Sequence, residues 1–189
     1  MKHASLFFSL VFLGFSGCAI GPGTQSPTAV PEDFVFFDLG QTIPVVDVTW
    51  KKQTIQDAIL SFTKVDREDS VLGISSVEAH GDKATVSFTS IDAQGQFAVV
   101  HFTLENKGTS KFEPWLILDK GCTLLDALGR SFPLNERCKL GFLIFKAVEP
   151  GKRGEYSFYF DIPKNSKPAS LRLDLIKAMI RLSGQEPRS

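Results

Sequence analysis

Hydrophobic and polar residues alternate with a period of two along much of the second half of the chain. Residues 83–89 and 97–105 carry apolar side chains at every second position. Strict alternation is typical of a β-strand with one buried face. Residues 156–162 and 171–175 predict two more strands of this kind. We therefore expect these side chains to point inward: Ala84, Val86, Phe88, Ala98, Val100, Phe102 and Leu104.

Turn residues separate these segments at short, regular intervals. His80-Gly81-Asp82 lies between two apolar stretches and predicts a β-hairpin, and Asn106-Lys107-Gly108 ends the next strand. Strands broken so often by Gly, Pro and Asn favour an antiparallel sandwich over an α/β layout. The sequence therefore predicts an all-β fold, with the main β-sandwich over residues 83–182 and a disordered tail over 183–189.

Residues 33–82 carry a mixed pattern and are interpreted as an N-terminal extension of strands and one short helix. Residues 44–50 predict a strand. Thr54 and Asp57 have the spacing of a helix-capping pair ahead of the apolar residues that follow. A short helix is expected there, with its buried face formed by Ile55, Ile59 and Phe62.

The start of the chain has the pattern of an export signal. A basic beginning, Met1-Lys2-His3, precedes an apolar run over residues 6–15, and small residues stand directly before Cys18. A transmembrane helix needs about 20 apolar residues, and this run is about half as long. Residues 1–17 are therefore predicted to be a signal peptide.

The stretch Phe15-Ser16-Gly17-Cys18 resembles a lipobox, the recognition sequence of bacterial lipoproteins, although Phe15 departs from the usual leucine. The resemblance implies that Cys18 is lipidated and becomes the first residue of the mature protein. Acyl chains on Cys18 would hold the protein stably on a membrane, because anchoring takes two chains or more. The alternative is an ordinary signal peptide whose cysteine is coincidental.

The residues after Cys18 predict the cellular location of the protein. Ala19 lacks the aspartate that resembles an inner-membrane retention signal, so in a bacterium with two membranes the outer membrane is expected. Residues 18–32 are rich in Gly, Pro, Ser and Thr and nearly free of charge, which predicts a flexible tether. The domain is expected outside the cytoplasm, in the cell envelope.

Net charge and cysteine content indicate which binding partners and which covalent or metal sites are expected. Without the signal peptide, 20 basic residues stand against 21 acidic ones, a net charge of −1 that attracts neither nucleic acid nor anionic lipid. Cys122 and Cys138 form an even pair in an oxidising compartment, and we expect a disulfide between them. No His and no CxxC pair lies between them, so a metal site is not expected.

Candidate catalytic residues are few. His80 adjoins the Gly81 turn, and His101 falls on the polar side of its strand, so both are interpreted as surface residues. Catalysis would require a Ser or Cys and a carboxylate near one of them, and the sequence does not indicate this. We therefore predict no enzymatic activity, no cofactor and no metal.

Aromatic residues are mostly expected in the core, and Trp115, next to Pro114, is the best candidate for an exposed binding surface. The aromatic set considered was Phe34, Phe36, Phe37, Trp50 and Trp115.

The order of motifs resembles a known family. The landmarks are QFAVVHFTLENKG at residues 96–108, a hairpin with the sequence CTLLDALGRSFP at 122–133, a Pro-Gly turn in VEPGK at 148–152, and FDIPK at 160–164. Together they resemble the immunoglobulin-like domains of bacterial lipoproteins, a family largely of unknown function. The resemblance covers about residues 83–176 and implies an immunoglobulin-like antiparallel β-sandwich. It supplies no catalytic residues.

Two functions of different class remain at this point. The favoured one is a non-catalytic protein-interaction or assembly module of the cell envelope, acting through sheet edges or end loops. The alternative is a carrier or sensor of a small ligand, which would need a partly apolar pocket with convergent polar groups.

Overall fold

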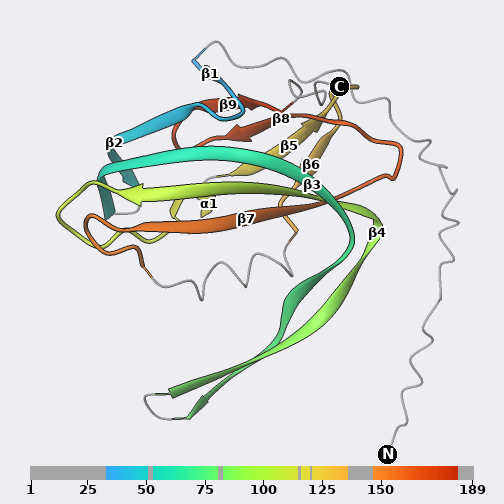
Figure 1. The fold of residues 1–189 in the computed structure, drawn as a ribbon, viewed down its shortest axis with the longest axis horizontal. Coiled ribbons are helices and arrows are strands. Elements are labelled where there is room, and N and C mark those ends of the chain that lie inside the picture. The colour runs from blue at the N-terminus through green and yellow to red at the C-terminus, as the bar shows by residue number, and fades with distance from the viewer. Residues whose placement is uncertain are drawn as a thin grey trace, which may run out of the picture.

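The computed structural model describes residues 33–50, 53–80, 83–114, 116–119, 121–135 and 147–182. Two β-sheets face one another (Figure 1). One sheet has five strands in the order β1-β9-β8-β5-β6, and the other has four in the order β2-β3-β4-β7. The fold is an all-β sandwich, as the alternating pattern predicted. The strands are β1 (Val35–Asp38), β2 (Thr42–Trp50), β3 (Gln53–His80), β4 (Lys83–Asn106), β5 (Cys122–Asp126), β6 (Ser131–Pro133), β7 (Arg153–Ile162), β8 (Pro168–Leu173) and β9 (Ala178–Arg181).

The inner faces of the two sheets form one main core. In the part of β4 that lies within the sandwich, the alternate residues predicted to point inward are all buried: Ala98, Val100, Phe102 and Leu104. Phe102 lies at the centre of an aromatic group, with ring centroids 5.3 Å from Phe62 and 4.4 Å from Phe158. Apolar burial of this kind is the main stabilising term of a sandwich.

The N-terminal extension predicted over residues 33–82 is not separate from the sandwich. β1 pairs in parallel with β9, the last strand, whereas β2 and β3 extend the other sheet. The domain boundary predicted between residues 82 and 83 falls between the paired strands β3 and β4. The division was wrong because strand pairing joins residues that are distant in sequence, which local composition does not report.

The helix predicted over residues 55–62 is also wrong, because this segment belongs to β3. It pairs with β2 on one side and with β4 on the other. The buried residues are Ala58, Leu60 and Phe62, with a period of two, whereas Ile59 is only partly buried. Two neighbouring strands satisfy the backbone along this segment, so tertiary pairing overrides the local capping signal.

Several predicted turns are confirmed. β4 ends at Asn106, whose buried side chain donates to the carbonyls of Ser110 and Val148 and accepts from Gly108 N. The Pro150-Gly151 turn leads directly into β7, and Gly151 has a positive φ of 71°. The hairpin predicted over residues 122–133 forms β5 and β6. The only helical element described is the single turn α1 (Leu116–Asp119), and no described helix has the length and apolar character to span a membrane.

Candidate interaction surface

β3 and β4 are much longer than the other strands, and their distal halves leave the sandwich together (Figure 1). β2 pairs with β3 only as far as Ser61, and β7 pairs with β4 only from Gln96 onward. Residues 70–80 and 83–92 pair only with one another among the described strands. We call this two-stranded ribbon the arm.

The arm bends at an irregularity in the ladder. Glu68 pairs with Phe97 and Ser70 with Asp92, so the four residues 93–96 of β4 stand opposite Asp69 alone. Extra residues in one strand bend it and increase its twist. Gly95 lies at this point, where a Cβ atom would be 2.2 Å from the carbonyl oxygen of Ile162. Only glycine fits this close approach.

Apolar contacts and hydrogen bonds fix the arm where it leaves the sandwich. Ile91 and the outward-facing Phe97 and Val99 form a small second core, with Val71 and Tyr159 packed against it. The Asp161 carboxylate accepts hydrogen bonds from the backbone N–H groups of Gln94 (2.8 Å) and Gly95 (3.1 Å). The bend is therefore a packed joint.

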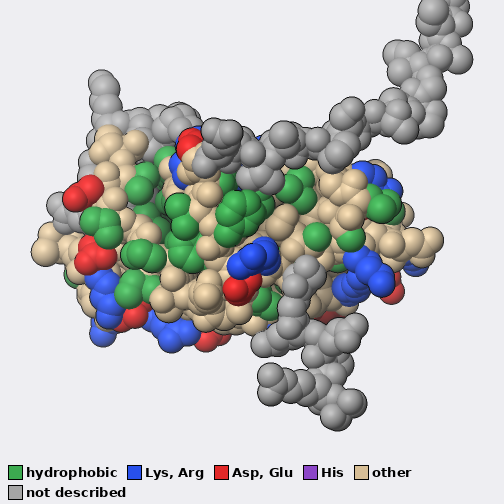
Figure 2. Space-filling view, turned by 90° about the horizontal axis from the view of Figure 1, so that it is seen from above, with side chains coloured by type: hydrophobic (Ala, Val, Ile, Leu, Met, Phe, Trp, Pro, Cys, Tyr) green, Lys and Arg blue, Asp and Glu red, His purple; other side chains and the backbone are tan. Residues whose placement is uncertain are grey.

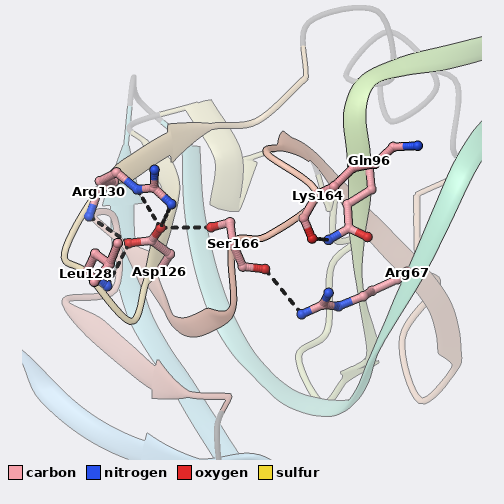
Figure 3. A network of polar contacts seen from close by, with 7 residues as sticks. All are labelled: Arg67, Gln96, Asp126, Leu128, Arg130, Lys164 and Ser166. Atoms are coloured by element: carbon pink, nitrogen blue, oxygen red, sulfur yellow. Dashed lines mark hydrogen bonds and ion pairs between the residues drawn. The ribbon is translucent and has the colours of Figure 1, made fainter. Parts of the chain in front are cut away.

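A buried carboxylate stabilises the loops beside this joint (Figure 3). Asp126, 4% exposed, accepts hydrogen bonds from the Ser166 hydroxyl (2.8 Å), the Arg130 guanidinium (2.8 Å) and the backbone N–H groups of Leu128 and Arg130. Burial disfavours the charged carboxylate, but these hydrogen bonds outweigh it and hold the pKa of Asp126 below its ordinary value.

The same loops contact the arm's base (Figure 3). Arg67 of β3 donates to the carbonyl of Ser166 at 3.2 Å, and Gln96 of β4 donates to the carbonyl of Lys164 at 2.9 Å. Both arm strands are thus connected to the loop between β7 and β8, and through Ser166 to Asp126. This network sets the direction in which the arm leaves the sandwich.

The arm carries two of the most exposed large apolar side chains among the described residues. Leu72 is 74% exposed and Phe88 is 65% exposed. Phe88 was predicted to point inward, and this was wrong, because no described strand of the second sheet lies opposite the arm to cover it. The side chains of Ala84 and Val86 lie outside the described part, so the prediction for them stays untested.

A polar groove of about 310 Å³ lies on the outer face of the four-stranded sheet. Lys64, His101 and Ser157 stand in one row across β3, β4 and β7. The Ser157 hydroxyl is 2.9 Å from His101 Nδ1, and His101 Nε2 is 3.0 Å from a carboxylate oxygen of Asp66, without a regular hydrogen bond. The hydrogen bond from Lys64, opposed by partial burial, holds the pKa of Asp66 below its ordinary value.

Ser157, His101 and Asp66 together have the residue types of a histidine-assisted nucleophile. The sequence did not indicate this grouping. Acyl transfer also needs donors placed over the developing oxyanion. In a pleated sheet the backbone N–H groups lie in the plane of the sheet, whereas the Ser157 side chain projects from its face. The ladder therefore offers no pair of donors above the hydroxyl, and we interpret the row as a cross-strand polar contact.

The structure describes some of the candidate site residues predicted from the sequence and leaves others outside its described part. Cys122 is a free, buried thiol, and burial raises its pKa far above the ordinary range. This differs from the predicted disulfide, and Cys138 lies outside the described residues. Cys18, the tether, the tail and Trp115 also lie outside them. Phe34 is buried against Leu125 and Met179, whereas Phe36 is half exposed.

No group of three or more His, Cys, Asp or Glu side chains that could hold a metal occurs within the described ranges. The distribution of charge does not single out a binding surface on the face that Figure 2 shows. Acidic and basic side chains are interspersed on this face, which is seen from above the view of Figure 1. The sequence did not indicate the arm as a candidate contact element, because a hairpin signal reports that two strands pair and not whether a third strand, among those described, lies beside them.

Comparison with known proteins gives only distant structural neighbours. An uncharacterized β-sandwich protein from Clostridium difficile 630 aligns with a TM-score of 0.49 at 12% identity, over 81% of this chain and 98% of that one. The secreted protein MPT63 from Mycobacterium tuberculosis aligns with a TM-score of 0.46 at 13% identity, over 80% and 99%. No protein-family model and no curated protein matches the sequence.

Proposed function

We propose that this protein is a cell-envelope lipoprotein, anchored through lipid on Cys18, that works as a non-catalytic protein-interaction or assembly module. The lipobox-like start and the tether support the anchor. In a bacterium with two membranes, Ala19 favours the outer membrane. The arm is the contact element, and the partner is a protein of the envelope.

The observation that carries this proposal is the exposure of Leu72 and Phe88 on a ribbon of only two strands. An isolated two-stranded hairpin is marginally stable in water, and an exposed apolar surface is a common mark of an interaction site. Burying one such side chain contributes about 1.5–3 kcal/mol. A partner that covers both side chains would stabilise the arm as well as the complex.

The position of the arm favours a protein partner over the membrane. The predicted tether joins the sandwich at β1, and in Figure 1 the arm ends on the opposite side of the molecule from β1. A domain held at the β1 side can point its arm away from the lipid surface. The Leu72 and Phe88 side chains are then accessible to other envelope proteins.

A small-ligand carrier remains the alternative proposal, with the groove around His101 as its site. This groove is polar, and it opens on the outer face of a sheet. Ligand sites are more often concave, largely apolar clefts that bury most of the ligand. We therefore place this function second.

The test is a cross-linking pull-down from intact cells with captured proteins identified by mass spectrometry. We compare the wild type with Leu72→Ser, Phe88→Ser and the anchor variant Cys18→Ser. Leu128→Ser is the matched control, because Leu128 is also 74% exposed but lies in the β5–β6 turn.

The proposal predicts a specific protein that is captured by the wild type and by Leu128→Ser, and lost in the arm variants and in Cys18→Ser. Equal capture by the arm variants and the wild type would exclude the arm as the contact element. Capture that is unchanged in Cys18→Ser would count against the need for an anchor.

A further inference from the structure

β3 has an edge along the arm that no described strand covers. From residue 63 to residue 80, no described strand pairs with β3 on the side away from β4. A strand added there would continue the line of β2 along the sheet. Unpaired edge N–H and C=O groups are a ready template for another strand.

The β2 edge and the β3 edge of this sheet differ in how well they are protected against pairing with another strand. β2, the edge strand beside the first half of β3, contains Pro44 and a residue with positive φ, Asp47. Proline, charge and kinks are the usual devices that keep edges from pairing. Residues 71–77 of β3 contain neither proline nor charge, and a shift in register at Ser75 is the only irregularity there.

The opposite edge of the arm, on β4, is closed at its base. The Asp161 carboxylate already occupies the N–H groups of Gln94 and Gly95, and Gly95 lies against the carbonyl of Ile162. The open edge of β3 is therefore longer and begins directly beside the sandwich.

We propose that a second copy of this chain occupies the β3 edge, so that two arms pair antiparallel and form a four-stranded sheet between two molecules. This inference rests on the proposed function and names the partner. Antiparallel pairing of identical strands closes around a two-fold axis, the commonest symmetry of oligomers. Because residues 71–77 are uncharged, the pairing brings no like charges into opposition there.

The proposed anchor also favours a second copy. Copies held by the same residue in the same membrane present their arms at the same height, and tethering raises their effective concentration. The dimer also supplies the third and fourth strands that a lone hairpin lacks.

Site-specific disulfide formation between full-length lipidated molecules in cells tests this proposal. Ser75 is exposed near the middle of the uncharged stretch, so it lies near the expected two-fold axis. Two copies of Ser75→Cys would be about 5 Å apart, one strand spacing. This is within the reach of a disulfide.

Ser87→Cys is the matched control, because Ser87 pairs with Ser76 on the same arm but lies on β4. Across a β3-edge dimer its two copies would be about 15 Å apart, three strand spacings and beyond disulfide reach. Ser131→Cys, exposed on the edge strand β6 of the other sheet, is a second control. The unmodified protein reports the background from Cys122 and Cys138.

We expect mild oxidation to give a species of twice the chain mass for Ser75→Cys, roughly tenfold more than for either control. Co-expression of tagged and untagged copies identifies both halves. A disulfide between Ser75→Cys and a different protein would reject the proposal that a second copy occupies the β3 edge. The proposed function would still stand. Dimers from Ser87→Cys alone would overturn the assignment to the β3 edge.

If Ser75→Cys gives no product while Leu72→Ser still abolishes protein capture, the second copy is rejected and the interaction module stands. If neither variant has an effect, both proposals fail. The two failures are therefore distinguishable.

Discussion

The sandwich body and the arm are built from the same two strands but are stabilised differently. In the body, β3 and β4 have neighbours on both sides and a second sheet against one face, and residues such as Leu60 and Phe102 are fully buried. In the arm, the same strands pair only with each other among the described strands, and Leu72 and Phe88 are exposed. The difference shows that strand pairing alone does not bury side chains. The stability of the arm therefore depends on the packed joint at its base.

The largest effect is expected in the centre of the body. Phe102→Ala removes the ring that contacts Phe62 and Phe158 and should lower the free energy of unfolding by about 4 kcal/mol. Urea unfolding followed by circular dichroism measures this. A loss below about 1 kcal/mol would mean that the aromatic group is not part of a tightly packed core.

The next effect concerns the loops beside the joint. Asp126→Ala leaves Ser166 and Arg130 without their shared acceptor and should cost about 3 kcal/mol. The Asp126 pKa is lowered in the folded protein, so its contribution is fully present above the ordinary carboxyl pKa of about 4. It is lost as the pH falls through the lowered value.

The stability difference between wild type and Asp126→Asn should therefore shrink as the pH is lowered below about 4. Urea titrations over a pH series check this sign. A difference that stays constant into strong acid would show that the carboxylate is not charged in the folded state.

A smaller and local effect is expected at the joint. Ile91→Ala removes the centre of the second core and should reduce the free energy of local opening of the arm by about 2 kcal/mol. Hydrogen exchange should accelerate in the arm amides and stay unchanged in β8. Equal acceleration in both would show that arm and body open as one unit.

The polar row on the outer face should matter little. Ser157→Ala removes one hydrogen bond to His101 and should cost about 1 kcal/mol. A serine-reactive organophosphonate should leave no adduct on Ser157, because the backbone N–H groups of the sheet lie in its plane and do not point at the hydroxyl. A stable adduct there, absent from His101→Ala, would establish an activated serine and revive an enzymatic function.

The smallest effect on stability is expected at the arm's surface. Leu72→Ser and Leu128→Ser should each change the free energy of unfolding of the purified monomer by less than about 0.5 kcal/mol, because both side chains are 74% exposed. Urea unfolding of the two variants measures this. A large loss in Leu72→Ser alone would show that this side chain already has a partner within the chain.

The sequence determined the elements whose signals are local. Period-two alternation placed β7 and, as two separate strands, the two halves of β4. The Asn106 and Pro150-Gly151 turns marked the end of β4 and the start of β7, and the family resemblance implied the β5–β6 hairpin. These predictions held because one buried face imposes its period on a strand and because turn residues act within a few positions.

Tertiary structure decided what depends on neighbours distant in the sequence. It made residues 55–62 a strand, because β2 and β4 pair on both sides of them, and it joined β1 to β9 at the opposite end of the chain. It left Phe88 exposed, brought Ser157 to His101, and left Cys122 a buried thiol. Each outcome depends on which strand lies beside or opposite a residue, and a local pattern does not contain that information.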